Sequence, residues 1–212
     1  MKEFWDAAFE KDKTTWGFVP ADSAVIARDL FLKNNLKKIL IPGIGYGRNA
    51  MAFLNQGFEI TGVEISKKAI ELARANNLVF PIHLGSVVDM PFDNEIYDGI
   101  YCYALVHLLN KTERKKFIKD CYDQLAVGGL MLFMVVSKAM EMYANGRLIS
   151  KDRYKIMKGL NVFFYDHKSV ENEFKNFGLV EYQEFVEPIK HLKDVNPISC
   201  FLVTCRKKEI IK

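Results

Sequence analysis

The chain has 212 residues, half of them apolar, and its 30 basic and 26 acidic residues give a net charge of +4. This length suits one α/β domain with a real core, so we expect residues 1–212 to form a single domain. No stretch approaches the roughly 18 uninterrupted apolar residues of a membrane span, and the start lacks the apolar centre of a secretion signal. We therefore expect a cytoplasmic protein that does not associate with membranes. The basic excess is scattered, which argues against a nucleic-acid partner.

The cysteines show no metal-binding spacing. None of them forms a CxxC pair, and three lie among strand-like apolar residues, where a thiol behaves as a small hydrophobe. We expect reduced structural thiols and no metal site at the four positions Cys102, Cys121, Cys200 and Cys205.

Strand-like and helix-like segments alternate through the first two thirds of the chain. The predicted strands of this part are 38–41, 58–63, 79–84, 96–104 and 130–136. Helices are expected at 48–55, after a Ser66 cap, and after an Asn110–Glu113 capping pair, the last of them ending at Gly128 and Gly129. Parallel strands need crossover connections, which are nearly always right-handed helices. The alternation therefore predicts a doubly wound α/β sheet with helices on both faces.

The last third departs from this alternation. A helix at 169–177, closed by Gly178, precedes strands at 179–186 and 198–205, and the loop between these strands is too short for a crossover. These strands must pair antiparallel, which gives a seven-stranded, mostly parallel sheet with an antiparallel C-terminal strand. Residues 137–168 are too long and too weakly periodic for a simple connection, and we interpret them as a substrate-side insertion.

A glycine loop is the strongest constellation in the sequence. Ile39-Leu-Ile-Pro-Gly43-Ile-Gly45-Tyr-Gly47-Arg48-Asn49 runs from a strand into a helix. Glycine permits positive φ and a close ligand approach, and the following helix offers free N–H groups. Glu64 ends the next strand, about 20 residues beyond the loop, where a carboxylate can accept both hydroxyls of a ribose.

The loop and Glu64 resemble the first two motifs of the class I methyltransferases that use S-adenosylmethionine (SAM). Gly-Tyr-Gly-Arg-Asn, followed by Phe-Leu-Asn-Gln-Gly-Phe-Glu-Ile-Thr-Gly-Val-Glu, is similar to the tellurite-resistance and thiopurine-type branch. The segments 85–92, 97–100 and 125–130 extend the resemblance over about 37–136. It implies a Rossmann-like fold, SAM as the cofactor, and residues 1–36 as an N-terminal helical cap.

The resemblance also implies roles for individual residues. Glu64 would hold the ribose, Ile65 would pack on the adenine, and Ser86 with the Val87 amide would meet the adenine edge. The expected cofactor-binding set is Gly43, Gly45, Gly47, Arg48, Asn49, Glu64, Ile65, Ser86, Val87 and Trp16. Arg48 and Asn49 face the methionyl end in this scheme, and Trp16 is a lid candidate. The sequence departs from the usual pattern at Pro42 and Ser86, where many members carry acidic residues.

Acid–base candidates follow the fourth strand. Tyr103 and His107 come at the carboxyl edge where open α/β sheets hold ligands, and histidine titrates near neutrality. The competing interpretation is that His107 makes a structural hydrogen bond and has no catalytic role. A soft acceptor such as a thiol needs no base, whereas an alcohol or amine would want one.

Three functions stay open at this point. The first is a methyltransferase acting on a small molecule as a monomer or weak dimer, favoured because no Asn-Pro-Pro-Tyr or Pro-Cys motif of the DNA-methylating enzymes is present. The second is a nicotinamide-dependent oxidoreductase, whose fingerprint wants glycine where Arg48 stands. The third is a noncatalytic SAM-binding module.

Overall fold

The main sheet has the predicted architecture. The computed structural model describes residues 1–14, 16–188 and 197–209, and its seven-stranded sheet has the order β3-β2-β1-β4-β5-β10-β9. Strands β1 to β5 pair parallel with one another, and β10 runs antiparallel to both of its neighbours. The strands are β1 (Lys38–Pro42), β2 (Glu59–Glu64), β3 (Ile82–Leu84), β4 (Tyr97–Tyr103), β5 (Leu125–Val136), β9 (Leu179–Glu187) and β10 (Ile198–Arg206). The predicted seven-stranded, mostly parallel sheet with its antiparallel C-terminal strand is confirmed.

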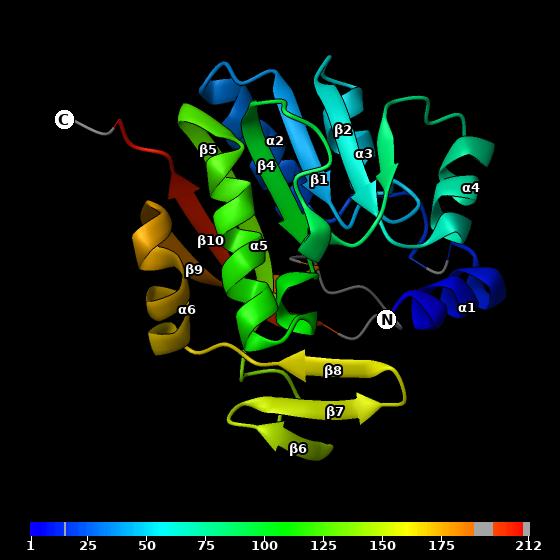
Figure 1. Ribbon diagram of the computed structural model, residues 1–212, viewed down its shortest axis with the longest axis vertical. Coiled ribbons are helices and arrows are strands. Elements are labelled where there is room, and N and C mark those ends of the chain that lie inside the picture. The colour runs from blue at the N-terminus through cyan, green and yellow to red at the C-terminus, as the bar shows by residue number, and fades with distance from the viewer. Residues whose placement is uncertain (15, 189–196, 210–212) are drawn as a thin grey trace.

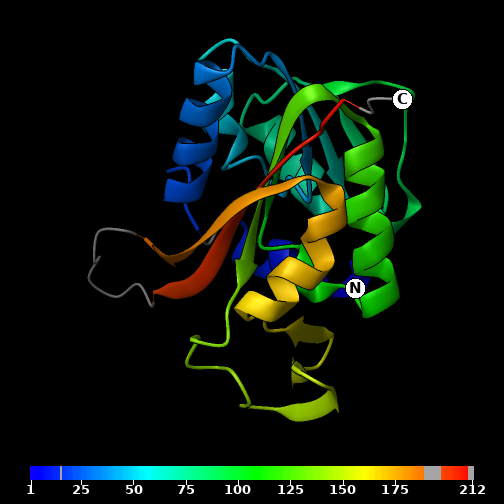
Figure 2. The same cartoon turned by 90° about the vertical axis from the view of Figure 1, so that its left-hand side faces the viewer.

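Helices cover both faces of this sheet. Figure 2 shows the sheet between α2 on one side and α5 with α6 on the other. The α-helices are α1 (Lys2–Asp12), α2 (Asp22–Lys33), α3 (Ala50–Leu54), α4 (Lys67–Ala75), α5 (Lys111–Asp123) and α6 (His167–Phe174), and the short 3-10 helices are η1 (Val87–Asp89), η2 (Val106–Leu108) and η3 (Lys175–Phe177). Among the described residues, no helix is long and apolar enough to cross a membrane.

Each face of the sheet has its own hydrophobic core. Phe31 of α2 and Phe53 of α3 pack with Tyr101 on one face. Phe117 of α5 and Phe174 of α6 pack against the sheet on the other face. Strand β5 contributes alternate residues to both clusters and is buried along 130–136, as a strand between two helical layers must be.

The carboxyl ends of the parallel strands point to one edge, and two additions lie there. Helix α1 and a small antiparallel sheet sit below the strand tips in Figure 1. The small sheet has the order β6-β7-β8 and is made of β6 (Arg147–Ser150), β7 (Arg153–Met157) and β8 (Leu160–Phe163). It lies within residues 137–168, which the sequence predicts as an insertion. The weak periodicity of this segment gave no sign of the three short strands.

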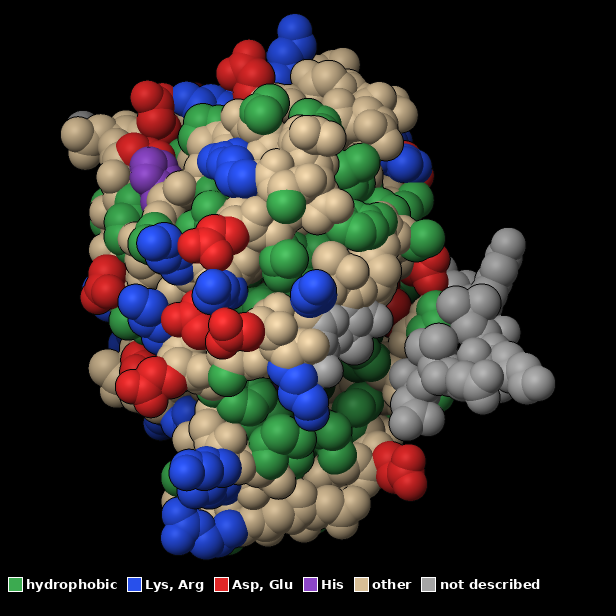
Figure 3. All heavy atoms as spheres, turned by 90° about the vertical axis from the view of Figure 1, so that its right-hand side faces the viewer, with side chains coloured by type: hydrophobic (Ala, Val, Ile, Leu, Met, Phe, Trp, Pro, Cys, Tyr) green, Lys and Arg blue, Asp and Glu red, His purple; other side chains and the backbone are tan. Residues whose placement is uncertain are grey.

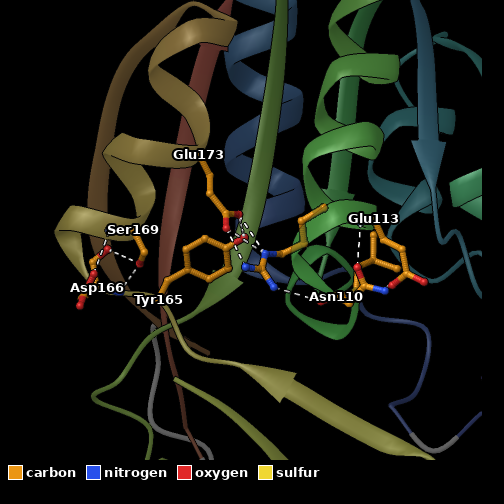
Figure 4. Close-up of polar contacts among 8 residues, drawn as sticks. Asn110, Glu113, Tyr165, Asp166, Ser169 and Glu173 are labelled. Atoms are coloured by element: carbon orange, nitrogen blue, oxygen red, sulfur yellow. Dashed lines mark hydrogen bonds and ion pairs between the residues drawn. The ribbon is translucent and has the colours of Figure 1, made fainter. Parts of the chain in front are cut away.

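Two helix ends behave as capping chemistry predicts. Asn110 Oδ1 accepts the Glu113 amide at 3.0 Å while Glu113 Oε2 accepts the Asn110 amide at 2.7 Å, which completes a capping box (Figure 4). Ser66 Oγ accepts the Ala69 amide at the start of α4. At the other end of the chain, Gly178 is left-handed with φ +72° and follows the helical segment as expected.

The predicted end of α5 was wrong. The helix ends at Asp123, and β5 begins at Leu125 instead of Leu130, so Gly128 and Gly129 lie inside the strand. Gly128 has φ +81° and interrupts the regular pairing, and its amide donates to Lys207 O. The glycine pair therefore accommodates an irregularity in a strand that pairs with β4 on one side and β10 on the other. Strand β3 is also shorter than predicted, because only 82–84 pair with β2.

A buried ion pair fixes the base of the insertion to the core. Arg114 of α5 donates to the Glu173 carboxylate of α6, with Nη2 to Oε1 at 2.7 Å. Tyr165 Oη donates to Glu173 Oε2 at 2.7 Å, and Figure 4 shows these two side chains pointing toward each other. The Arg114 guanidinium also lies 3.8 Å from the centre of the Phe163 ring. Two helices and the end of β8 thus meet at one cation.

Candidate functional site

The glycine loop leaves β1 and folds back onto β2. The amides of Gly43 and Ile44 both donate to Val63 O, which turns the chain sharply at the strand end. Gly43, Gly45 and Gly47 have φ values of +69°, +59° and +86°, in the left-handed region that side chains disfavour. The loop therefore needs its glycines for backbone conformation as well as for access.

The glycines differ in what surrounds them. A Cβ on Gly45 would meet one described atom within 4 Å, Phe9 Cζ at 3.8 Å, so the loop backbone is bare there. A Cβ on Gly47 would lie 2.2 Å from Leu78 Cδ1, inside the distance that two carbon atoms tolerate. Gly47 is therefore required by packing, while Gly45 leaves room for a ligand.

Glu64 faces the glycine loop from the end of β2. Its Oε2 accepts the Gly45 amide at 2.8 Å and its Oε1 accepts the Ser66 amide at 2.8 Å. The side chain is buried, and this burial raises the pKa of the carboxyl, while the two amides act in the opposite direction. A buried carboxylate held between two backbone amides is a rigid acceptor whose position is set by the loop itself.

These residues fit an adenosyl ligand. The amides of Gly45 and Ser66 use only part of the acceptor capacity of Glu64, which is about four lone pairs, so sites remain for the two ribose hydroxyls. Ile65 is half-buried beside Glu64 and offers an apolar surface. Ser86 Oγ accepts the Val88 amide at 3.4 Å, and Val87 is buried in η1. Ile65, Ser86 and Val87 follow β2 and β3, which are adjacent strands, so the structure brings the expected adenine side together with Glu64.

Arg48, Asn49 and Trp16 have contacts that do not involve Glu64. Trp16 stacks on Tyr46 with ring centres 6.4 Å apart and planes 7° apart, and half of its surface is exposed. Arg48 Nη1 donates to Trp16 O at 3.4 Å. Asn49 is buried, and its Oδ1 accepts the Ala21 amide at 2.9 Å, so it anchors the start of α2. The structure therefore gives Asn49 a structural partner and places Trp16 beside the loop, where its role as a lid stays a prediction.

The acid–base candidates separate in the structure. Tyr103 ends β4 with the Arg48 guanidinium 5.5 Å above its ring, and burial raises the pKa of its phenol. His107 is buried in η2, and its Nδ1 accepts the Val136 amide at 3.4 Å. Burial, with a smaller contribution from Arg114, lowers the pKa of His107 to about 3. An imidazole with this pKa is a weak base, so a structural hydrogen bond describes His107 better. A catalytic role for His107 stays a prediction, and its burial disfavours that role.

Two groups of site residues had no sequence pattern to reveal them. In α1, Asp6 Oδ1 accepts a hydrogen bond from the Ser66 hydroxyl at 2.6 Å, and Phe9 Cζ lies 3.8 Å from the Cβ position of Gly45. At the end of β9, the buried Glu187 carboxylate accepts the amide and hydroxyl of Ser23 at 3.0 and 3.1 Å. Glu187 lies 164 residues from its partner in sequence, so only the closed tertiary structure shows that it fixes the start of α2.

Groups that could ligate a metal ion do not assemble in the described part of the chain. No three His, Cys, Asp or Glu side chains come together there in a metal-binding arrangement. The four cysteines are buried free thiols, and burial raises the pKa of each of them.

Comparisons with known proteins agree with this geometry. Residues 39–129 match the family described as "Methyltransferase domain". The chain is 24% identical over 217 residues to the tRNA N(3)-methylcytidine methyltransferase Mettl2 of Drosophila melanogaster, covering 87% of this chain and 63% of that protein. It is 23% identical over 118 residues to the ubiquinone biosynthesis O-methyltransferase of Rickettsia akari (strain Hartford), covering 54% and 46%. The chain thus spans about half to two thirds of the length of these curated relatives.

Solved structures share the fold at low sequence identity. A S-adenosylmethionine-dependent methyltransferase from Clostridium acetobutylicum ATCC 824 superposes with a TM-score of 0.72 at 13% identity, covering 97% of this chain and 99% of that one. TehB from Haemophilus influenzae gives 0.64 at 19% identity, covering 96% and 67%.

The matched domain, the strand order and the bare glycine loop facing a buried carboxylate agree with one another. They favour a methyltransferase over the oxidoreductase alternative, since the match over residues 39–129 is to a methyltransferase domain. Residues 39–129 are thus similar to a methyltransferase domain, and the chain has the fold of a solved S-adenosylmethionine-dependent methyltransferase.

Proposed function

We propose that this chain transfers a methyl group from SAM to a small-molecule acceptor. The observation that carries the proposal is the buried Glu64 carboxylate, held by the Gly45 and Ser66 amides opposite a bare loop backbone. The noncatalytic alternative would need the same cofactor site. It differs in predicting no turnover of any thiol, amine or hydroxyl acceptor.

The chemistry asks little of the protein beyond placement. When bound, SAM supplies a sulfonium methyl carbon to which an acceptor lone pair bonds while the carbon–sulfur bond breaks toward sulfur, the acceptor proton being lost to solvent. Glu64 and the loop amides hold the adenosyl side in place, and rigid placement in near-attack geometry can contribute about 7–11 kcal/mol. The phenol of Tyr103 stays protonated because burial raises its pKa, so it can donate a hydrogen bond and does not serve as a general base.

A small molecule is our preferred acceptor, and the tellurite-resistance and thiopurine-type branch is our preferred placement. The fold likeness to TehB and the Gly-Tyr-Gly-Arg-Asn loop support the branch. The likeness to the ubiquinone biosynthesis O-methyltransferase supports a small acceptor. The likeness to Mettl2, which covers most of this chain, favours tRNA as the competing acceptor. Measuring S-adenosylhomocysteine release with tRNA and with small thiols, amines and phenols separates the two.

Cofactor binding provides the direct test. Calorimetry should show that S-adenosylhomocysteine binds and that NADH does not. Glu64→Ala should weaken S-adenosylhomocysteine binding by about 1.5–3 kcal/mol, which is the contribution of hydrogen bonds to a charged group. Glu64→Gln keeps the size of the side chain and should also weaken binding. It provides the test if Glu64→Ala fails to fold.

Glu59→Ala is the matched control, because Glu59 is an exposed carboxylate at the other end of the same strand. It should leave the affinity unchanged. Equal affinity for S-adenosylhomocysteine in the wild type, Glu64→Ala and Glu64→Gln would exclude the proposed ribose contact.

A further inference from the structure

Helix α1 and the tip of the β7–β8 hairpin line an open pocket of about 340 Å³. We name it the aromatic pocket, because its walls include Phe4, Trp5, Phe9 and Trp16, with Met157 and Leu160 on the hairpin side. Figure 3 shows hydrophobic side chains gathered on the lower part of this face of the molecule. Its volume lies within the roughly 300–1,000 Å³ typical of small-ligand sites.

The pocket shares walls with the glycine loop. Phe9, which lines the pocket, is also the residue nearest to a Cβ placed on Gly45. Trp16, a second wall, stacks on Tyr46 of the loop and accepts a hydrogen bond from Arg48 through its carbonyl oxygen. The pocket therefore adjoins the loop that we propose holds the cofactor, with Phe9 and Trp16 common to both.

The wall chemistry favours a flat apolar ligand. The ring centres of Trp5 and Phe9 lie 5.8 Å apart with their planes at 31°, and those of Phe9 and Trp16 lie 6.3 Å apart with their planes at 75°. A ligand in the pocket can therefore contact both ring faces and ring edges. Aromatic pairs in offset-stacked or edge-to-face geometry contribute about 0.5–1.5 kcal/mol beyond their buried area. Lys13 is the one charged residue among the described lining residues, and it can pair with an anionic group at the rim.

We propose that the aromatic pocket holds the methyl acceptor and selects a flat, apolar molecule that carries one acidic group. This inference rests on the proposed function, because it assigns the second substrate of the same site. The insertion 137–168 then acts on the substrate side through its hairpin tip, where a Cβ on Gly159 would meet Phe4 at 3.0 Å.

The two tryptophans of the chain, Trp5 and Trp16, both line the pocket and give a direct readout. In a proton–nitrogen correlation spectrum of the full chain, the two indole N–H signals are assigned with Trp5→Phe and Trp16→Phe. The probes are 2-naphthoate, the uncharged 2-naphthylmethanol, and the aliphatic anion octanoate. We expect 2-naphthoate to shift both indole signals, and octanoate to bind about tenfold more weakly because it cannot stack.

A pair of variants on one helix separates the pocket from the cofactor site. Ala8 lines the pocket, whereas Ala7 is exposed on α1. Ala8→Leu should fill the pocket and weaken 2-naphthoate binding at least about tenfold, which corresponds to about 1.4 kcal/mol. It should leave the affinity for S-adenosylhomocysteine unchanged. Ala7→Leu adds the same atoms outside the pocket and should change neither affinity. Lys13→Gln should remove the preference for 2-naphthoate over 2-naphthylmethanol, which we expect to be about two- to fivefold for an exposed ion pair.

The outcomes are distinguishable from a failure of the proposed function. Indole signals that ignore 2-naphthoate, or equal binding by Ala8→Leu and Ala7→Leu, would overturn the pocket assignment even if S-adenosylhomocysteine binds. Indole shifts that follow protein concentration instead of probe concentration would show a second copy of the chain on this face and would also overturn it. Absence of S-adenosylhomocysteine binding would remove the proposed function, while the spectra would still decide whether the pocket binds flat anions.

Discussion

Single residues at this site have structural and chemical roles, and two of the loop glycines show how these roles differ. Gly45 has a positive φ and an open surface, while Gly47 has a positive φ and faces the buried Leu78. A sequence motif gives both positions the same weight. The physical cost of replacing them differs, because only one of them is closed by a neighbour.

Gly47→Ala should destabilise the fold more than Gly57→Ala. Both glycines are left-handed, so each alanine meets conformational strain of about 1–2 kcal/mol. Gly57 has open space around its Cβ position, whereas the Cβ at Gly47 meets Leu78 at 2.2 Å and adds about 1–3 kcal/mol of overpacking. Urea unfolding of the two variants measures the difference, and equal midpoints would show that Leu78 moves aside without cost.

His107 should make stability depend on pH in a defined direction. Its pKa is about 3 in the folded protein and about 6.5 in an unfolded chain, so between these values only the unfolded chain binds the proton. The free energy of unfolding therefore falls as the pH drops from 6.5 toward 3, by about 1.4 kcal/mol per pH unit from this group.

The measurement compares urea unfolding of the wild type and His107→Gln between pH 6.5 and pH 4. The variant should have the shallower pH dependence. Parallel curves would mean that the imidazole is already protonated in the folded protein or exposed to water.

At the scale of elements, ion pairs matter according to where they lie. Arg114 is almost completely buried, with its side chain 3% exposed, and it joins α5, α6 and the end of β8. Lys119 and Asp123 form an exposed pair on the same helix α5. Desolvation makes the buried cation dependent on its partner, whereas water solvates the exposed one.

Arg114→Met should lower the free energy of unfolding by about 3 kcal/mol, because it leaves the Glu173 carboxylate without its cation in a mostly buried site. Lys119→Met is the control on the same helix and should change stability by less than about 1 kcal/mol. Chemical denaturation of both variants gives the comparison. A similar loss in the two would show that the buried pair is solvated in the folded state.

At the scale of the whole molecule, the main sheet and the small sheet differ in how well they are covered. Residues 130–136 of β5 are buried between two helical layers, whereas all four residues of β6 are exposed. Local opening is easiest where few apolar contacts must break. The main sheet thus provides a rigid platform, and the small sheet forms a less protected wall of the aromatic pocket.

Hydrogen exchange should resolve this difference. Peptides covering 147–157 should exchange their amides much faster than peptides covering 130–136, because opening β6 exposes little apolar surface. Saturation with 2-naphthoate should slow exchange around Met157 and Leu160 if the aromatic pocket binds it. Uniformly strong protection of both regions in the free protein would contradict a loosely held insertion.

Much of the architecture is readable from local chemistry. The glycine loop, the Ser66 cap and the Asn110–Glu113 capping box depend on neighbours within a few residues, so sequence spacing predicts them. The mostly parallel sheet with an antiparallel C-terminal strand follows from connection lengths. Gly128 and Gly129 mislead this kind of reasoning, because glycine ends helices and accommodates strand irregularities equally well.

The fold class and the glycine loop were predictable from the amino-acid sequence, since periodicity, capping and turn chemistry are local properties. Tertiary structure alone decided which groups meet across the chain. It placed Asp6 on Ser66, Glu187 on Ser23, His107 against the Val136 amide, and the aromatic face of α1 opposite the hairpin tip. Burial and distance set pKa values and pocket walls, and both depend on residues that are far apart in sequence until the core closes.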